Sequence, residues 1–392
     1  LQFDNEESLW IGTWGSGLFK LNTTTLNYKH YGAAKNTSQG LLVDQVMQVK
    51  TDSLNNLWIG TFSAGMSYFN KKENVFTHFP NLSVDSVTSY RYTIKSIHID
   101  KKGRVWVATE LLGLRLFDPS SQSFQVIESG PLKKDMTILT IHEDKNGLLW
   151  LGTNGVGLIS YNPDNNTTQL YTDKSGLPNN MIYAIEEDMQ TGNFWLSSNK
   201  GLSEFDPLKK TGRNYNRADG LQGNQFNPES SLQTGDGTLL FGGINGMDAF
   251  TPNTIKTSEW LPTIVFTNFL LDNVEANVND KGSPLKNNII LSEDIDLKYD
   301  QNSFSVEFAM LEHSFSRSNQ YAYMLEGLNQ SWQYVGADRK ATFTNLYPGT
   351  YTLKVKASNS DGLWTTAEKT LVINIRPAWW QTTLFKAAII TL

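Results

Sequence analysis

Five residues that directly follow a repeated Gly-Thr step, or a variant of it, have the side chains best suited to contact a ligand. They are Trp14, Phe62, Glu110, Asn154 and Asn199. Their place in the repeat is constant while their chemistry varies, which is expected of residues that line a binding surface. Exposed rings such as Trp14 and Phe62 suit stacking on sugars, and the Glu110 carboxylate suits contacts with hydroxyl groups. The competing interpretation is that these positions only pack on neighbouring loops.

A second group of candidate ligand residues, Tyr90, Arg91 and Tyr92, lies in a loop between two repeats. The guanidinium of Arg91 can hold a carboxylate or a sulfate through two parallel hydrogen bonds. Packing within the loop is the alternative for these residues as well. Together with the five residues above, they form the predicted ligand-binding set.

No combination of residues in the sequence predicts catalysis or metal binding. His98 and His142 lie two residues before a turn aspartate, where other repeats have lysine or glutamate, so both are interpreted as structural. No histidine pair has metal-ligand spacing and no Gly-x-Ser-x-Gly motif occurs. The turn acids Asp100 and Asp144 stand alone among lysines and asparagines, unlike a calcium loop. We expect no catalytic residue, no metal and no cofactor.

The strands that must position these residues are predicted by a sequence motif at residues 149–161, which recurs along the first two-thirds of the chain. A sixth, degenerate copy lies at residues 239–243. The five tryptophans of the other copies follow one another at intervals of 44 to 48 residues: Trp10, Trp58, Trp106, Trp150 and Trp195. This period is typical of a four-stranded propeller blade, of roughly 40 to 50 residues. One Trp at the same place in each blade indicates packing between blades rather than sugar stacking.

Each repeat divides into four strands, most clearly at residues 93–99, 104–109, 114–118 and 123–127. In such a meander, the turns after the first and third strands share one face of the propeller, and the remaining connections share the other. The second face carries the long irregular segments, at residues 32–44, 80–92, 129–137, 172–180 and 218–225. Because loops on a rigid scaffold usually carry binding, we expect the ligand on this second face.

A different all-β pattern begins near Leu261. Short alternating segments separated by turn signals lie at residues 264–271, 289–291, 303–309, 320–325, 341–344, 350–358 and 371–375. About seven strands of this kind indicate an immunoglobulin-like sandwich. The predicted fold class is therefore all-β, with a propeller of six visible four-stranded blades at 1–258 and a sandwich at 259–376. Tyr321, Tyr323 and Tyr351 are expected to anchor the sandwich core with their hydroxyls bonded at its margin.

Composition excludes some functions, and the C-terminal residues lead us to expect a membrane boundary. The 33 basic and 39 acidic residues give a net charge of -6, without the basic stripe that nucleic-acid binding requires. The absence of cysteine excludes disulfides. An apolar run begins at Leu384 and stops short of the roughly 20 residues of a spanning helix. We interpret 377–392 as a juxtamembrane segment and the start of a truncated transmembrane helix.

These motifs resemble a known pair of families. The repeats are similar to the two-component regulator propeller repeat, and residues 219–227 resemble its terminal blade. The segments 321–327, 345–351 and 359–364 resemble the triple-tyrosine Ig-like domain that follows such propellers. The run from Arg376 to Trp380 resembles the segment that leads into the membrane helix.

The resemblance implies the periplasmic sensor region of a hybrid two-component system, which detects glycan fragments and signals through the sandwich to a transmembrane helix and a histidine kinase. It implies an oligosaccharide ligand, a homodimer formed through the sandwich and the membrane-proximal region, a membrane contact through the C-terminal helix, and no nucleic acid. The fragment itself is expected not to be an enzyme. The family has seven-bladed propellers, so either six blades close here or an upstream blade has been removed.

Two other functions remain open at this stage. Some propellers are lyases or glycosidases, and a pair of acids at the pore mouth would favour that interpretation, although the sequence offers chiefly Glu110. Other propellers are protein-protein scaffolds, which a stable protein partner without sugar binding would favour.

Overall fold

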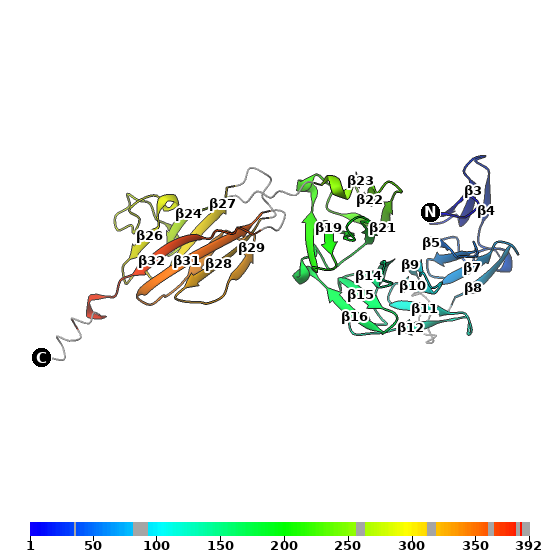
Figure 1. The fold of residues 1–392 in the computed structure, drawn as a ribbon, viewed down its shortest axis with the longest axis horizontal. Helices are drawn as coiled ribbons and strands as arrows, with labels where there is room; N and C mark the ends of the chain where they lie inside the picture. Colours follow the sequence, from blue (N-terminus) through cyan, green and yellow to red (C-terminus); the bar gives the residue numbers. More distant parts are fainter. Residues whose placement is uncertain are drawn as a thin grey trace. The chain divides into compact units, whose positions relative to one another are not determined.

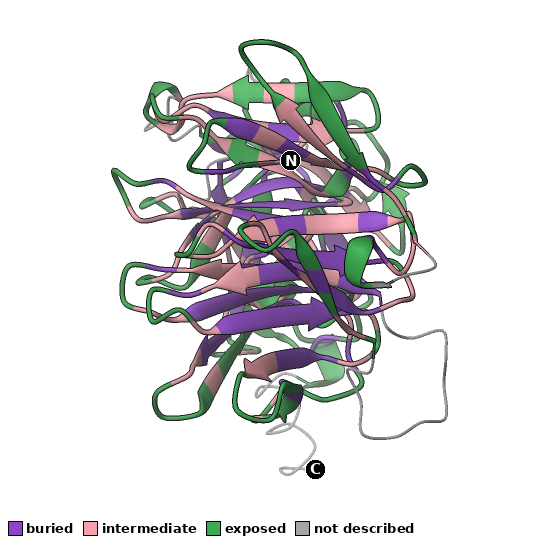
Figure 2. Ribbon diagram, turned by 90° about the vertical axis from the view of Figure 1, so that its right-hand side faces the viewer, coloured by how far each residue is buried: buried purple, intermediate pink, exposed green. Residues whose placement is uncertain are grey.

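The computed structural model describes residues 1–34, 37–80, 93–255, 263–311, 319–359, 364–381 and 385. It divides into two compact units, Leu1–Ile255 and Lys256–Leu392, each of which is built from β-strands (Figure 1). The predicted all-β class, a propeller followed by an Ig-like sandwich, is confirmed. Buried residues concentrate in the strands, whereas turns are mostly exposed (Figure 2).

Unit 1 contains six antiparallel sheets among its described residues, five with four strands and the last with three. The strands of the first three sheets are β1 (Gln2–Phe3), β2 (Ser8–Gly12), β3 (Leu18–Asn22), β4 (Tyr28–Tyr31), β5 (Val46–Thr51), β6 (Leu57–Thr61), β7 (Met66–Asn70), β8 (Val75–Phe79), β9 (Ile94–Ile99), β10 (Val105–Thr109), β11 (Leu114–Asp118) and β12 (Ser123–Ile127). Those of the next three are β13 (Ile138–Glu143), β14 (Leu149–Thr153), β15 (Leu158–Asn162), β16 (Thr167–Tyr171), β17 (Ala184–Glu187), β18 (Phe194–Ser198), β19 (Gly201–Asp206), β20 (Thr211–Tyr215), β21 (Phe226–Gln233), β22 (Leu239–Gly243) and β23 (Gly246–Phe250). The short 3-10 helices of this unit are η1 (Thr37–Gln39), η2 (Asp173–Ser175), η3 (Arg217–Asp219) and η4 (Pro252–Thr254).

The repeated tryptophans join each blade to the next, as predicted. Each is buried, and each ring contacts an aromatic ring on the third strand of the following blade. The pairs and their centroid distances are Trp10–Phe69 at 6.0 Å, Trp58–Phe117 at 4.9 Å, Trp106–Tyr161 at 5.9 Å, Trp150–Phe205 at 6.1 Å and Trp195–Phe250 at 4.6 Å. Aromatic burial at every blade boundary therefore stabilises the series.

The two terminal blades of the series differ from the others in burial. Leu57 and Ile59 of the second blade are fully buried, whereas the equivalent Leu9 and Ile11 of the first blade are half-buried. At the other end, Met247 is 59% exposed where the fifth blade has the fully buried Leu202. The sixth blade was also expected to have four strands but has three in the described part, because the chain turns into η4 at Pro252, which cannot donate a ladder hydrogen bond.

Unit 2 is a sandwich of two sheets. One has the strand order β25-β24-β27-β30 and the other β26-β32-β31-β28-β29. Their bounds are β24 (Ile264–Leu271), β25 (Val274–Glu275), β26 (Asp294–Leu297), β27 (Phe304–Met310), β28 (Gln320–Glu326), β29 (Gln333–Gly336), β30 (Lys340–Phe343), β31 (Gly349–Ser358) and β32 (Lys369–Ile375), with 3-10 helices η5 (Ile289–Leu291) and η6 (Trp379–Gln381). The strand predicted at 289–291 is η5 instead, because the Asn288 side chain accepts from Ile290 N at 3.1 Å and caps a helical turn.

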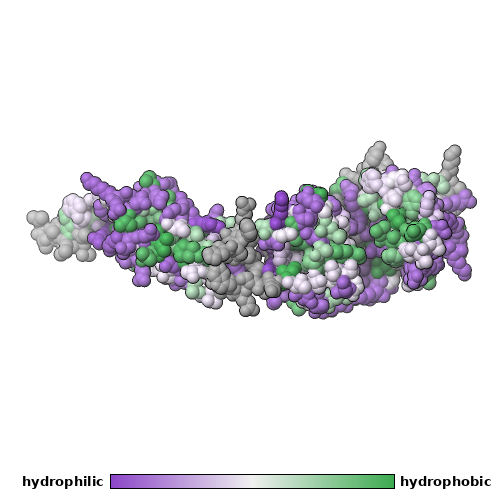
Figure 3. All heavy atoms as spheres, turned by 90° about the horizontal axis from the view of Figure 1, so that it is seen from above, coloured by the Kyte–Doolittle hydropathy of each residue, from purple (hydrophilic) through white to green (hydrophobic). Residues whose placement is uncertain are grey.

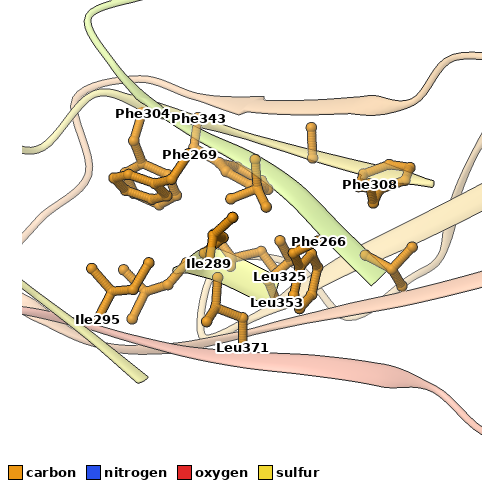
Figure 4. Packing of buried hydrophobic residues seen from close by; sticks show 14 of the residues in the cluster. Phe266, Phe269, Ile289, Ile295, Phe304, Phe308, Leu325, Phe343, Leu353 and Leu371 are labelled. Carbon is orange, nitrogen blue, oxygen red and sulfur yellow. The ribbon is translucent and has the colours of Figure 1, made fainter. Parts of the chain in front are cut away.

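The sandwich core contains two of the three predicted tyrosine anchors, Tyr321 and Tyr351, while Tyr323 is half-buried and packs against the core. Figure 4 shows phenylalanines of the first sheet, such as Phe266 and Phe308, facing Leu325 and Leu353 of the second. Tyr321 is buried and its hydroxyl accepts from Met310 N at 3.2 Å, while the Tyr351 hydroxyl donates to Tyr347 O at 3.0 Å. In both cases the ring fills the core and the hydroxyl is bonded at its edge.

Hydrophobic side chains also reach the surface of both units in patches between hydrophilic stretches (Figure 3). Across the described residues, no helix has the length and apolar character needed to cross a membrane.

Candidate functional site

The Gly-Thr step holds each hairpin of the predicted binding face in a fixed shape. The hydroxyls of Thr61, Thr109 and Thr153 donate to the carbonyl four residues later, at 2.8, 2.8 and 2.6 Å. All three threonines are fully buried. A buried hydroxyl bonded across the turn fixes the hairpin and directs the next residue of the chain out of the blade.

The residues after the step are also anchored by their own backbone. The amides of Phe62, Glu110 and Asn154 donate to carbonyls of the loop that enters the same blade, at 3.0, 3.0 and 3.1 Å. Their backbone positions are thus set by the scaffold, and their side chains are left to differ. These equivalent places form a rim of candidate ligand residues along the face formed by the connections after the second and fourth strands.

The two aromatic members of the rim lie together. Trp14 is 62% exposed and Phe62 38% exposed, and their ring centroids are 5.0 Å apart with an interplanar angle of 59°. The residues come from adjacent blades and are 48 positions apart in the sequence. Two exposed rings at this separation form a small apolar surface with polar surroundings, which is the usual chemistry of a ligand platform.

The next blade places a charged pair on the rim. Glu110 Oε2 lies 2.8 Å from Lys95 Nζ, and both side chains remain partly accessible. Lys95 belongs to the inner strand β9, so this ion pair joins the rim to the centre of the blade series. An accessible ion pair can exchange partners with a polar ligand at little cost, because water already screens it.

Amide side chains continue the rim on the fourth and fifth blades. Asn154 is exposed, while Asn199 is half-buried and its Oδ1 accepts from Asn179 Nδ2 at 2.6 Å. The neighbouring Gly155 N donates to Asn180 O at 3.1 Å. Since Asn179 and Asn180 were not singled out from the sequence, the amide group is larger than predicted.

The rim therefore brings the predicted residues into three groups rather than one site. Trp14 contacts Phe62, Glu110 contacts Lys95, and Asn199 contacts Asn179. Within the described residues, no hydrogen bond or ring contact joins one of these groups to another. The predicted ligand residues Tyr90, Arg91 and Tyr92 lie outside the described residues.

Two recesses in unit 1 lie at the opposite ends of the strands. One has a volume of about 370 Å³ and is lined by turn residues of the fifth and sixth blades and by the start of η4, including Asp188, Gly235 and Pro252. The other, of about 190 Å³, lies between the fourth and fifth blades beside Trp150 and Leu208. Sequence reasoning assigned only short polar turns to this face.

A half-buried glutamate at the centre of unit 1, with one carboxyl oxygen fully sealed, was also missed. Glu229 Oε2 accepts from Gln48 Nε2 at 2.8 Å, which links strands β21 and β5, and Glu229 Oε1 is sealed from solvent and has no hydrogen-bond partner among the described residues. The residue has a positive φ of 52° at a β-bulge, a conformation that costs a non-glycine residue about 1 kcal/mol. Burial raises the pKa of Glu229 to about 8, although Ser96 and the charges of nearby lysines oppose the rise.

Comparison with known proteins gives two family matches. Residues 312–376 match the Y_Y_Y domain, and residues 133–155 match the two component regulator propeller. The chain is also 31% identical over 170 residues to Histidine kinase P4 of Formosa agariphila, an alignment that covers 42% of this chain and 12% of that protein. The two domain types expected from the sequence motifs are thereby confirmed.

Solved structures are similar to this chain over nearly its whole length. The extracellular domain assigned to the hybrid two component system BT3049 of B. thetaiotaomicron has a TM-score of 0.72 at 28% identity, over 96% of this chain and 50% of that one. PorZ of Porphyromonas gingivalis, a bacterial surface component of the type-IX secretion system, has a TM-score of 0.51 at 13% identity, over 96% of this chain and 51% of that one. The PorZ likeness concerns the fold alone. This chain spans about half the length of either structure.

Proposed function

We propose that this chain, a two-component regulator propeller joined to a Y_Y_Y domain, is the extracytoplasmic sensor part of a hybrid histidine kinase and response regulator. The similarity to the extracellular domain of the B. thetaiotaomicron system over 96% of the chain supports this placement. The periplasm of a Gram-negative bacterium is the compartment that follows from it. The similarity to Histidine kinase P4 supports a kinase elsewhere in the full-length protein.

The rim supports an oligosaccharide as the ligand. The observation that carries this proposal is the exposed pair of Trp14 and Phe62 on neighbouring hairpins, followed along the rim by a carboxylate and by amides. Sugar rings present apolar faces that stack on aromatic rings and hydroxyls that need donors and acceptors. The order of groups along the rim matches an extended ligand better than a compact one.

Isothermal titration calorimetry of the chain against a panel of oligosaccharides tests this proposal. Removing either ring, by Trp14→Ala or Phe62→Ala, should weaken binding of a positive saccharide about tenfold, because apolar contact area is lost. The matched control is Tyr28→Ala, which removes a 70% exposed ring at the opposite ends of the strands and should leave affinity unchanged. Equal losses in all three variants, or a binding saccharide insensitive to both rim rings, would refute the rim as the binding site.

We also propose that this part of the protein binds its ligand without cleaving it. Glycoside hydrolysis requires two carboxylates flanking the scissile bond. The carboxylate of Glu110 is instead paired with Lys95 at 2.8 Å. Chromatography of any bound saccharide after prolonged incubation checks this, and the release of shorter products that depends on Glu110 would favour the enzyme alternative.

Signal transfer is proposed to run from the propeller through the sandwich of a homodimer. A ligand can bias a dimer between two arrangements only if it binds them with different affinities. Light scattering of the chain with and without a bound saccharide should therefore show a change in the dimerisation constant. An unchanged constant at saturating ligand would remove the dimer equilibrium from the mechanism.

A further inference from the structure

Five exposed aromatic and aliphatic residues of unit 2 lie in segments that leave the sandwich at the same end. They are Tyr299 (45% exposed), Leu328 (55%), Tyr347 (83%), Trp379 (64%) and Trp380 (44%). None of them belongs to the sandwich core cluster. They are called the exit-end residues below.

The strand register brings these segments together. Strands β26 and β32 are parallel and finish level, with Leu297 paired to Ile375, so the segments carrying Tyr299 and Trp379 begin side by side. The rings of Tyr299 and Trp380 are 5.1 Å apart, which shows that these two segments meet.

The remaining two exit-end residues reach the same end by antiparallel pairing. Strand β31 starts opposite the end of β32, because Gly349 pairs with Ile375, and Tyr347 directly precedes that start. Strand β28 finishes beside the start of β31, which puts the following turn and Leu328 at the same end. Leu311, by contrast, follows β27 at the other end, where Met310 pairs with Ile264.

From this arrangement we propose that the exit end of the sandwich is a lipid-contact surface that rests in the headgroup layer of a bilayer. Trp and Tyr are the residues that accumulate at membrane-water interfaces, because one part of each ring system is apolar and the other is polar. Lys298 lies in the same segment as Tyr299, Arg376 precedes Trp379 and is ion-paired with Asp296 at 3.1 Å, and the amino acids at 384–392 are mostly apolar. A bilayer headgroup layer is the occupant that suits exposed aromatic and aliphatic side chains flanked by a lysine and an ion-paired arginine.

The inference rests on the proposed function in placing unit 2 beside a membrane, but its test involves no saccharide. A failure of lipid contact would leave the calorimetric result standing, and a failure of saccharide binding would leave the lipid result standing. The two proposals can therefore be refuted separately.

Single-cysteine labelling gives a direct test, because the natural chain has no cysteine. Leu328→Cys and Tyr347→Cys report on the exit end, and Leu311→Cys, at a 55% exposed site, is the matched control. Each is labelled with a nitrobenzoxadiazole dye and mixed, as the full 392-residue chain, with vesicles of phosphatidylethanolamine and phosphatidylglycerol. We expect a blue shift and stronger emission at 328 and 347, quenched by brominated lipid, and no change at 311.

An unlabelled variant separates the exit-end residues from the apolar residues that follow in the sequence. Leu328→Ser combined with Tyr347→Ser should lower the vesicle partition coefficient about tenfold, because two apolar contacts with lipid are removed. The control Leu311→Ser should leave partitioning unchanged. Three results would overturn the proposal: equal dye responses at 311 and 347, unchanged partitioning of the double variant, or a response that needs high protein concentration instead of vesicles and so reports contact between two copies.

Discussion

At the residue scale, the turn aspartates have a role that links them to the repeated tryptophans. The carboxylates of Asp4, Asp100 and Asp144 accept from the indole N–H six residues later, at 2.8, 2.9 and 3.0 Å. Each carboxylate also accepts backbone amides of its own turn. The acid therefore satisfies a buried indole and closes the turn with the same two oxygens.

Exceptions to this pairing occur in the other blades. In the fifth blade one more residue separates Asp188 from Trp195, and the buried Trp195 Nε1 has no hydrogen-bond partner in the part of the chain that the structure describes. In the sixth blade both members are replaced, by Thr234 and Leu240. In the second blade the interval from Asp52 to Trp58 is also six residues, but the Asp52 carboxylate accepts from the Tyr68 hydroxyl at 3.2 Å. The interval thus permits the pairing without ensuring it, and only the turn chemistry of the acids was predicted.

Replacing Asp4 should make the free energy of unfolding less dependent on pH in the acidic range. Burial alone would raise the pKa of Asp4, but hydrogen bonds from Lys71, Trp10 and two backbone amides outweigh it and lower the pKa to about 2. A carboxyl whose pKa is lower in the folded state than in the unfolded state stabilises the fold at pH values above its unfolded pKa. This contribution is lost as the pH falls from about 4 towards 2. Asp4→Asn should cost about 2 kcal/mol at pH 7, measured by urea unfolding.

The pH profile distinguishes this effect from a simple loss of packing. The difference in unfolding free energy between the natural chain and Asp4→Asn should shrink below pH 4. Asp135→Asn is the control, since Asp135 lies at an exposed place in the loop before β13. A difference that stays constant down to pH 2 would contradict the proposed role of the Asp4 charge.

At the element scale, the hairpin after each second strand is the part of the blade that presents the rim. In the fourth blade, the Thr153 hydroxyl donates to Gly157 O and accepts from Val156 N at 3.1 Å. Gly157 has a φ of 115°, and a side chain there would meet Tyr171 O at 2.2 Å. The hairpin therefore needs both the hydroxyl and the glycine to hold its shape.

Thr153→Val tests the hydroxyl without changing the shape of the side chain. Because Val156 N loses its acceptor in a partly buried turn, the free energy of unfolding of the variant should be about 1 kcal/mol lower. Amide exchange at Val156 should also accelerate. Thr167→Val, at an exposed place in β16, is the control, and equal losses in the two variants would show that the hairpin hydroxyl has no special role.

At the scale of the whole propeller unit, Glu229 connects parts of the chain that are far apart in sequence. Its bond to Gln48 spans 181 residues and joins the second blade to the sixth. Gln48 also accepts from Ile97 N of the third blade. The neighbouring pairs His98–Glu143 and His142–Glu187, each at 3.1 Å, tie consecutive inner strands in the same way. Polar contacts at the centre thus complement the aromatic contacts between blades.

Glu229→Gln should remove a pH dependence of stability. The folded pKa is raised to about 8, so between about 4.5 and 8 the folded state holds a proton that the unfolded state has released. Stability should therefore fall as pH rises through this window, by at most about 1.4 kcal/mol per pH unit. Glutamine keeps the bond to Gln48 without the charge, so the variant should lack this fall and exceed the natural chain in stability at pH 9.

Thermal unfolding from pH 5 to pH 9 measures this effect. Glu73→Gln, at an exposed turn, should follow the natural chain at every pH and serves as the control. Parallel pH profiles for the natural chain and Glu229→Gln would mean that the carboxyl does not titrate in this window.

The sequence by itself determined the features that repeat at a fixed interval. The 44 to 48 residue period, the Trp at one place per blade and the alternating strands near the C-terminus each depend on local propensity and burial. The positions of the rim residues after each Gly-Thr step follow from the same local pattern. The short segment at 289–291 was misassigned because three apolar residues carry no periodicity, and the Asn288 cap decides the helical turn.

Only the tertiary structure decided which of these residues meet. Trp14 reaches Phe62 and Gln48 reaches Glu229 because of the angle and offset between blades. Lys95 reaches Glu110 within one blade, across the irregular register of β9 on β10. The angle and offset between blades arise from the packing of whole sheets on one another, and the composition of a single repeat does not contain them. The burial that shifts the pKa of Glu229 has the same origin, since residues from several blades together exclude water from one carboxyl.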